Sequence, residues 1–373
     1  MRFSRCILWI VLLAASAGEA QNARQNALAL EAQGQNAEAE TLWQEIARNE
    51  PHNPEPFAHL GLLEARQQRL DQAITDYRHA LALDPSFPGL EMNLGLALFK
   101  ANRFQEAIKP FSDELKKHPG DQRLLILLGL SHYGMGDYLV AVPYLKRAAA
   151  NDPQNLPLRL TLAHACLWSK QNSCVMEVYK EILALNAESA EADMLAGEAL
   201  DEEGKVAEAT QQFRAAAKAN PKEPNVHFGL GYLLWEQKQY DEAAKEFQAE
   251  LANDPTSAQA LAYLGDTYVE LNDYTSALPA LEKAVAAAPS IAFVHRDLGI
   301  VYASLDRKEE AVAELQKAIA LDPKDVTPHW RLGRLYQSMG RKEEAKAEFD
   351  KASTMNKQSV QALVEKLGQD RNQ

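Results

Sequence analysis

The motifs of the common reactive sites are missing from this sequence. It holds no G-x-S-x-G, no G-x-x-x-x-G-K-[ST], no G-x-G-x-x-G and no H-E-x-x-H, the patterns that prepare a nucleophile, a phosphate site, a dinucleotide site and a zinc site. Three histidines, His227, His295 and His329, lie 68 and 34 residues apart, which indicates one repeated structural position rather than a metal centre. We therefore expect no catalytic residues, no metal and no cofactor.

Composition narrows the remaining classes of function. The 373 residues carry 39 Lys and Arg against 52 Asp and Glu, a net charge of −13. This balance argues against a general nucleic-acid binder, which needs a basic surface. Apolar residues make up 46% of the chain, which excludes wholesale disorder. The length exceeds one hydrophobic core, so several domains or a repeat array are expected.

The first twenty residues have the pattern of a secretory signal. Arg2 and Arg5 precede the apolar stretch 6–15, and small residues at 15–20 offer two cleavage sites. We interpret residues 1–20 as a signal peptide of bacterial style, which predicts an exported, periplasmic or secreted protein. An uncleaved anchor is the alternative, although the apolar stretch is short for a membrane span. No later segment is apolar enough to span a membrane.

A period of 34 residues runs through the rest of the chain. Prolines keep this interval with one vacant slot at Ala187: Pro51, Pro85, Pro119, Pro153, Pro221, Pro255, Pro289 and Pro323. Small residues keep it too: Gly61, Gly95, Gly129, Ala163, Gly197, Gly231, Gly265, Gly299 and Gly333. A second small residue follows each of these after twelve positions, except at Val175, and a large apolar residue four positions later. Ten units result, starting near 20, 54, 88, 122, 156, 190, 224, 258, 292 and 326.

This pattern resembles the tetratricopeptide repeat family, whose 34-residue unit is W-x2-L-G-x2-Y…A-x3-F…P. Residues 261–289 match it through Leu264, Gly265, Tyr268, Ala277 and Pro289. The resemblance covers about 340 residues, nearly the whole chain after residue 20. It implies an all-α, right-handed superhelical solenoid of about ten helix-turn-helix repeats over residues 21–359. In this family the position of the three histidines packs between helices.

The spacing within one unit explains the hairpin. Phe57, Leu60, Gly61 and Glu64 form one stripe of a first helix. Small residues at the crossing let a second helix approach, and the residue before Pro85 is biased away from helix. Each hairpin leaves an apolar face that the next hairpin covers. We expect residues 360–373 to form a short polar helix that caps the last open face.

The unit 156–189 departs from the pattern. It has Ala163, Cys166, Val175, Ile182 and Ala187 where other units have Gly, a larger residue, Ala, usually Ala, and Pro. Neutral drift with altered packing is one interpretation, and a local bend or a docking point is the other. Cys166 and Cys174 lie on either side of the turn of this hairpin. In an oxidising compartment they could form a disulfide, and otherwise they are two buried thiols; their spacing is not C-x-x-C.

In this family the face of the first helices opposite the core lines a concave surface where ligands bind. Many of its positions are apolar here, and aromatic side chains are common anchors in interfaces. The successive sets are Met92, Leu96 and Phe99; Ile126, Leu130 and Tyr133; Leu160, His164 and Trp168; Phe228, Tyr232 and Trp235; and Trp330. Either these residues form a ligand groove or tight superhelical winding buries them between neighbouring units.

Charge changes sign along the same face. Acidic residues cluster in the sixth to eighth units: Glu198, Asp201, Glu202, Glu236, Asp266 and Glu270. Arg296, Arg331 and Arg334 follow in the ninth and tenth. An acidic wall beside aromatic anchors suits a peptide with apolar and a few basic side chains, whereas an ordinary solvated face is the alternative. The Lys, Asn and Arg set with which some family members grip a C-terminal carboxylate is absent, because Met92, Leu96 and Ile126 occupy positions it needs.

The sequence thus favours a non-enzymatic scaffold that binds a protein or peptide in its groove, in the cell envelope. One alternative is an accessory subunit of an envelope machine for polysaccharide or protein export and assembly. Another is a self-associating structural array. The sequence does not identify the partner.

Overall fold

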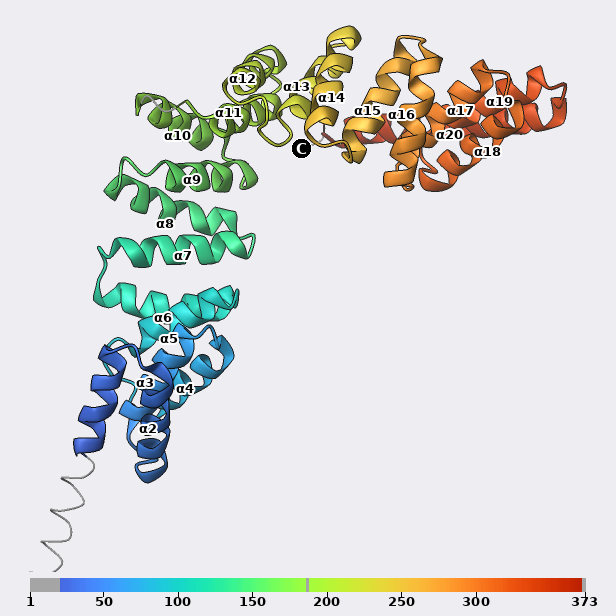
Figure 1. Cartoon of the computed structure of the whole chain (residues 1–373). Coiled ribbons are helices and arrows are strands. Elements are labelled where there is room, and N and C mark those ends of the chain that lie inside the picture. Colours follow the sequence, from blue (N-terminus) through green and yellow to red (C-terminus); the bar gives the residue numbers. More distant parts are fainter. Residues whose placement is uncertain (1–20, 186–187, 371–373) are drawn as a thin grey trace, which may run out of the picture. The chain divides into compact units, whose positions relative to one another are not determined.

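The computed structural model describes residues 21–185 and 188–370, with side chains described to residue 361. The predicted signal peptide therefore lies outside the described residues. Helices and turns account for the described chain, which contains no strand (Figure 1). It divides into two compact units, residues 1–185 and 186–373, and each is described by itself.

In the first unit residues 21–32 are helical, and helical hairpins follow. The helices are α2 (Asn36–Asn49), α3 (Pro54–Arg66), α4 (Leu70–Leu83), α5 (Leu90–Lys100), α6 (Phe104–Lys117), α7 (Gln122–Gly134), α8 (Tyr138–Asn151), α9 (Leu156–Trp168) and α10 (Asn172–Ala184).

The second unit repeats the arrangement. Its helices are α11 (Ala190–Glu202), α12 (Val206–Ala219), α13 (Val226–Glu236), α14 (Tyr240–Asn253), α15 (Ala258–Glu270), α16 (Tyr274–Ala287), α17 (Ala292–Ser304), α18 (Lys308–Leu321), α19 (Thr327–Ser338) and α20 (Lys342–Asp370).

Packing follows chain order within each unit. The two helices of a repeat contact each other, as α3 does α4 and α17 does α18, and the second helix packs on the first helix of the next repeat. One core cluster accordingly draws on several repeats of the second unit, from Leu261 to Ala345. The all-α solenoid predicted from the 34-residue period is thus confirmed within each unit.

The recurring small residues are sites of close helix approach. A Cβ placed on Gly61 would lie 2.7 Å from the Tyr77 ring, and one on Gly231 would lie 2.8 Å from the Phe247 ring. Both distances are below van der Waals contact, so a larger side chain would separate the two helices. The large residue sixteen positions later fills the space that the glycine leaves.

Helix ends also follow the sequence pattern. α4 stops at Leu83, and Asp84 has extended backbone angles, φ −141° and ψ 99°. Pro85 explains this, because proline disfavours the helical conformation of the residue before it. α3 begins with Pro54 at its first position, and the Asn53 side chain accepts a hydrogen bond from the backbone of Glu55.

The turn inside each hairpin contains a residue in the left-handed region, at one position of every repeat. The residues are Gly34, Gln68, Asn102, Gly136, Lys170, Gly204, Lys238, Asn272, Asp306 and Gly340, with φ between 57° and 79°. Glycine and asparagine adopt this conformation readily. Gln68, Lys170, Lys238 and Asp306 do so at a conformational cost.

The C-terminal helix corrects one prediction. Residues 360–370 do not form a separate capping helix, because α20 runs without a break from Lys342 to Asp370. The physical reason is in the sequence: Lys357 occupies the slot where other units have proline, so nothing ends the helix there. Val360 is exposed, and it covers no apolar face.

The irregular unit packs as a normal hairpin. Val175 and Ile182 are fully buried, as are Cys166 and Ala165, so larger residues replace the usual alanines inside the core. The first compact unit ends directly after this hairpin, at Leu185. The position Ala187, where other units have proline, lies outside the described residues.

Candidate functional site

The first helices of the second unit form one continuous surface layer. α11, α13, α15, α17 and α19 each contact the next helix of this set. Side chains that point away from the core on these helices therefore share one face, which we call the first-helix face. The sequence-predicted residues Asp201, Phe228, Tyr232, Trp235, Arg296 and Arg334 lie on helices of this layer.

A ring cluster centred on Tyr263 occupies the middle of this face. The Tyr263 ring centroid lies 5.8 Å from that of Phe228, 5.4 Å from that of Tyr232 and 5.3 Å from that of Trp235. Phe293 joins it from the next repeat at 5.3 Å. These rings are half-buried, so neighbouring repeats bury part of each ring and leave part exposed.

A buried polar network lies beside the Tyr263 cluster. Trp235 Nε1 donates a 2.6 Å hydrogen bond to Asp266 Oδ2, which ties α13 to α15. The Arg296 guanidinium lies 3.2 Å from Asp266 and 2.8 Å from Asp297. The indole and the guanidinium are thus held by their neighbours, so Trp235 and Arg296 are structural ties as well as surface residues.

Asp297 is the most deeply buried carboxyl of this network, with 1% of its surface exposed. Burial raises its pKa well above the ordinary value, Arg296 opposes this shift, and Asp266 adds to it.

A pocket of about 180 Å³ opens between α11 and α13. We call it the acidic pocket. Met194, Phe213, Phe228 and Tyr232 supply its apolar wall, while Glu198 and Asp201 supply carboxylates; Asn225, Gly229 and Leu233 complete the lining.

Carboxylates crowd the acidic pocket. Glu236 Oε1 accepts a 3.0 Å hydrogen bond from the Tyr232 hydroxyl. Burial and this hydrogen bond raise the pKa of Tyr232 to about 12. Burial raises the pKa of Asp201 as well, and the neighbouring Glu236 and Glu202 add to that shift. Glu202 itself is exposed at the end of α11.

A second pocket, of about 280 Å³, lies between α17 and α19. We call it the arginine pocket. Arg331, Arg334 and Ser338 line it from α19, with Ile300 and Ser304 opposite on α17; the lining also includes Tyr274, Gly299, Ala303, Lys308, Leu315 and Leu335. Trp330 lies on the same helix, 40% exposed, with its ring 5.3 Å from that of Phe349.

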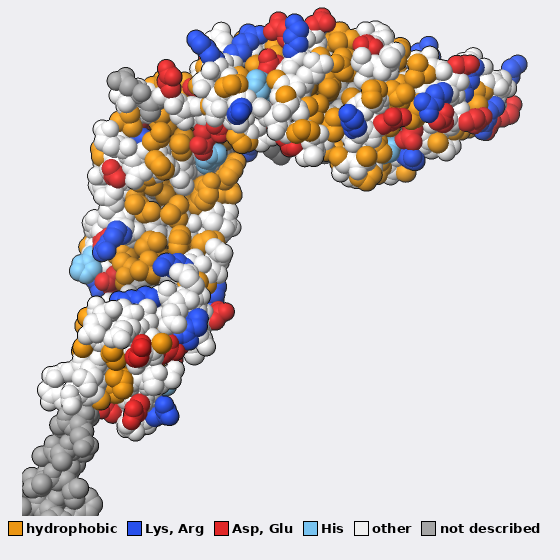
Figure 2. All heavy atoms as spheres, in the orientation of Figure 1, with side chains coloured by type: hydrophobic (Ala, Val, Ile, Leu, Met, Phe, Trp, Pro, Cys, Tyr) orange, Lys and Arg blue, Asp and Glu red, His pale blue; other side chains and the backbone are white. Residues whose placement is uncertain are grey.

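In the first unit the predicted anchors divide into two groups. Met92, Leu96 and Phe99 are half-buried and pack against the core of their repeats. Tyr133 and Trp168 come together, with ring centroids 5.6 Å apart, and Tyr138 lies 4.9 Å from Trp168. Figure 2 shows hydrophobic side chains gathered over α7 to α9, where Leu139 is 68% and Trp168 is 47% exposed.

The repeated histidines tie the two helices of their own hairpins. In each case Nδ1 lies within hydrogen-bond distance of a glutamate nineteen residues later: His227 to Glu246, His295 to Glu314 and His329 to Glu348. Nε2 of His295 also contacts the carbonyl oxygen of Pro289, at 2.9 Å. These contacts account for the recurrence of histidine, and they hold the loop before the repeat against it.

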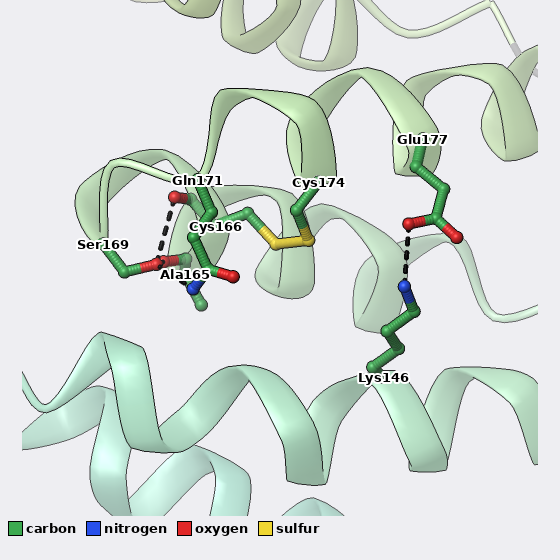
Figure 3. The surroundings of a disulfide bond; sticks show 7 residues. All are labelled: Lys146, Ala165, Cys166, Ser169, Gln171, Cys174 and Glu177. Carbon is green, nitrogen blue, oxygen red and sulfur yellow. Dashed lines mark hydrogen bonds and ion pairs between the residues drawn. A yellow bond between two sulfur atoms is a disulfide. The ribbon is translucent and has the colours of Figure 1, made fainter.

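Cys166 and Cys174 are joined by a disulfide between α9 and α10, with Cα atoms 5.7 Å apart (Figure 3). The turn they enclose is held by further bonds: Ser169 Oγ donates to the carbonyl of Ala165, and Gln171 Nε2 donates to Ser169 Oγ. Lys146 on α8 pairs with Glu177 on α10 at 2.7 Å. The disulfide is therefore part of the hairpin's packing and is buried.

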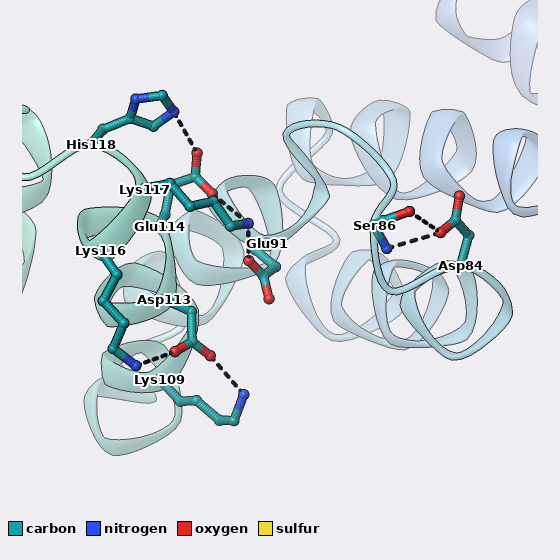
Figure 4. Close-up of polar contacts among 9 residues, drawn as sticks. All are labelled: Asp84, Ser86, Glu91, Lys109, Asp113, Glu114, Lys116, Lys117 and His118. Carbon is teal, nitrogen blue, oxygen red and sulfur yellow. Dashed lines mark hydrogen bonds and ion pairs between the residues drawn. The ribbon is translucent and has the colours of Figure 1, made fainter.

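Ion pairs neutralise most of the charge around α6 (Figure 4). Asp113 lies between Lys109 and Lys116, whose ammonium groups lower its pKa to about 2. Lys117 bridges Glu91 on α5 and Glu114 on α6. The charges of these residues are thus balanced by partners on the same surface.

Sequence reasoning missed Tyr263, Phe293 and Tyr138. Tyr263 shares a helical stripe with Asp266 and Glu270, three and seven positions later, so the acidic series could have pointed to it. The contacts of Phe293 depend on how two repeats pack, which the local pattern does not contain.

These features define a class of protein: helix-turn-helix repeats whose first helices carry an exposed, chemically mixed face. The tetratricopeptide repeat model matches residues 24–88, 60–122, 92–156, 177–224, 196–258 and 264–326, and a second model of the same description matches 132–197 and 302–367. The chain belongs to the tetratricopeptide repeat family. Proteins built from this repeat are in general non-enzymatic interaction scaffolds, and the fold implies binding of a protein partner.

Individual relatives are more distant. A TPR repeat-containing protein of Methanocaldococcus jannaschii is 32% identical over 79 residues, which is 21% of this chain and 14% of that protein. The chain therefore matches only a small part of that relative. In the described residues of the present protein, no helix has the length and hydrophobicity needed to cross a membrane.

Solved structures show similar repeats. MamA residues 41 to the end, from Desulfovibrio magneticus, is 25% identical, covers 46% of this chain and 97% of its own, and has a TM-score of 0.43. The APC/C hetero-tetramer Cut9–Hcn1 is 18% identical over 80% of this chain and 58% of that chain, with a TM-score of 0.48.

Proposed function

We propose that this protein is a non-enzymatic scaffold that binds a partner polypeptide on the first-helix face of its second unit. The observation that carries the proposal is the acidic pocket, where half-exposed aromatic rings meet carboxylates at one concave site. Binding sites in general combine an apolar lining with a few convergent polar groups. The exposed Trp330 and the Tyr263 cluster extend the apolar contact surface along the same face.

A pull-down from extract of the source organism tests this proposal. Wild-type protein is cross-linked beside a Met194→Ala, Tyr232→Ala and Trp330→Ala variant, after circular dichroism has shown that the variant is folded. Leu321→Ala is the matched control, because Leu321 is 43% exposed on the second helix α18. Partners should be lost with the triple variant and retained with the control. Equal recovery with all three proteins would contradict the proposal.

The same experiment separates the two alternatives. A single partner recovered in fixed stoichiometry would indicate an accessory subunit of a larger machine. Recovery of the protein itself would indicate a self-associating array, for which the exposed Leu139 and Trp168 of the first unit are candidates.

We also propose that the scaffold is exported to the cell envelope. The sequence of residues 1–20 supports this, as does the pairing of Cys166 with Cys174, because disulfides persist in oxidising compartments. The N-terminal sequence of the protein from fractionated cells tests it. A mature start near residue 21 in the exported fraction is expected, whereas an intact Met1 in the cytosol would contradict it.

A further inference from the structure

The two pockets of the second unit carry opposite charge. In the acidic pocket Asp201 is half-buried and forms no ion pair with a Lys or Arg of the described chain. Glu236 accepts a hydrogen bond from the Tyr232 hydroxyl and forms no ion pair with a Lys or Arg of the described chain. The carboxylates of Asp201 and Glu236 are therefore not balanced by a Lys or Arg of the described chain. Phe228 and Tyr232 line the same pocket, and aromatic rings attract cations to their faces.

The arginine pocket is the positive counterpart. Arg331 and Arg334 are exposed, lie one helical turn apart on α19, and form no ion pair with a described residue. This contrasts with Arg307 and Arg341 of the same unit, each of which is paired with a glutamate three residues later. Guanidinium groups free of such pairing are suited to binding a carboxylate.

The positions of the pockets set the spacing of their ligands. The α17–α19 pocket lies three first helices further along the layer than the α11–α13 pocket. Contacting helices lie about 8–10 Å apart. An extended chain advances about 3.3 Å per residue. About seven to nine residues would therefore connect groups held in the two pockets, and the Tyr263 cluster would contact the residues between them.

We propose that the partner is an extended polypeptide segment with a fixed charge order. A Lys or Arg side chain enters the acidic pocket, an Asp or Glu side chain meets Arg331 and Arg334, and apolar side chains between them lie on the Tyr263 cluster. The opposite charges set the direction in which the segment lies along the face. This inference rests on the proposed function, because it names the chemistry of the partner bound at that face.

A display library of random hexadecapeptides, selected on the immobilised full chain, is the test. Enriched peptides should carry a basic and an acidic residue about seven to nine positions apart, in one order. Asp201→Asn with Glu236→Gln should abolish the basic preference alone, and Arg331→Gln with Arg334→Gln the acidic preference alone. Each variant should weaken a selected peptide about threefold to tenfold, as expected for partly exposed ion pairs. Glu208→Gln with Lys218→Gln, which removes one exposed charge of each sign from α12, is the control and should change neither preference.

The possible failures are distinguishable. Enriched peptides without a charge order, or with an order unchanged in both variants, would overturn this inference and leave the proposed function standing. No enrichment above an unrelated helical protein would count against the proposed function itself. If sedimentation shows that the wild type self-associates and that the charge variants are monomers, a second copy occupies the face and the inference is wrong.

Discussion

At the residue scale, the left-handed turn position has the simplest energetics. Lys238 has a φ of 59° and its side chain is exposed. The left-handed conformation costs a non-glycine residue about 1–2 kcal/mol. The exposed lysine side chain forms no ion pair with the described residues that would offset this cost.

We expect Lys238→Gly to raise the free energy of unfolding of the second unit by about 0.5–1 kcal/mol, since glycine removes the strain but adds entropy to the unfolded chain. Urea unfolding followed by circular dichroism measures it. Lys245→Gly, an exposed lysine inside α14, is the control and should lower stability by about 1 kcal/mol. A loss of stability in Lys238→Gly would contradict the prediction.

Asp297 makes stability depend on pH. Its pKa in the fold is raised by burial, so the folded state holds a proton that the unfolded state has already released above its ordinary pKa of 3.8. The folded state binds more protons in that range, and stability therefore falls as the pH rises.

Asp297→Asn should remove this loss of stability at rising pH, because asparagine does not ionise. The free energy of unfolding of the variant minus that of the wild type should increase from about pH 4 upward, by at most about 1.4 kcal/mol per pH unit. Urea titrations at several pH values measure the difference. Asp322→Asn, which removes an exposed carboxylate after α18, controls for the change in net charge. A difference that does not vary with pH would show that Asp297 is ionised in the fold.

At the scale of the element, the hairpin α9–α10 holds the larger residues that replace the usual alanines, and the disulfide joins its two helices. The two cysteines have a sequence separation of 8, so the bond closes a short loop. In the loop-entropy model, closing a loop of this size lowers the conformational entropy of the unfolded chain, and this stabilises the folded state by about 2–3 kcal/mol.

Cys166→Ala with Cys174→Ala should therefore lower the stability of the first unit by about 2–3 kcal/mol. Dithiothreitol should destabilise the wild type by a similar amount and leave the double variant unchanged, as measured by urea unfolding. Alkylation and mass spectrometry confirm the redox state. If the reductant has no effect on a wild type that is shown to be reduced, the bond does not stabilise the hairpin.

A side-chain bridge also joins the two helices of the last hairpin. His329 and Glu348 join α19 to α20, and both are buried. His329 lies near the start of α19, and α20 continues beyond the bridge to Asp370.

At the scale of the whole molecule, each unit contains its own cores. One cluster, from Ala73 to Leu128, lies within the first unit, and another, from Leu261 to Ala345, lies within the second. Stability in repeat proteins comes from each repeat and its neighbours.

We expect the fragment 188–373 to fold alone and to keep the peptide preferences of the full chain. Far-ultraviolet circular dichroism and a cooperative urea transition measure folding, and the selected hexadecapeptide measures binding. The fragment 21–185 serves as the control, since it lacks both charged pockets. A fragment 188–373 that is unfolded, or that is folded but does not bind a peptide bound by the full chain, would contradict the prediction.

The repeat family and the all-α fold of helical hairpins could be predicted from the sequence alone. These features depend on a 34-residue period, on proline stereochemistry and on small residues at fixed spacing, all of which are local. The exception is residues 360–370, where a polar segment looked like a separate cap but the absence of a breaker at Lys357 let α20 continue.

Only the tertiary structure decided which polar and aromatic residues are held by neighbours and which line a pocket. Trp235 and Arg296 looked like surface anchors, yet Asp266 on another repeat binds both. Asp201, Arg331 and Arg334 had the same appearance in sequence but line pockets. The physical reason is that partners thirty residues apart meet through packing between repeats, and the chemistry at that contact depends on both sequences at once.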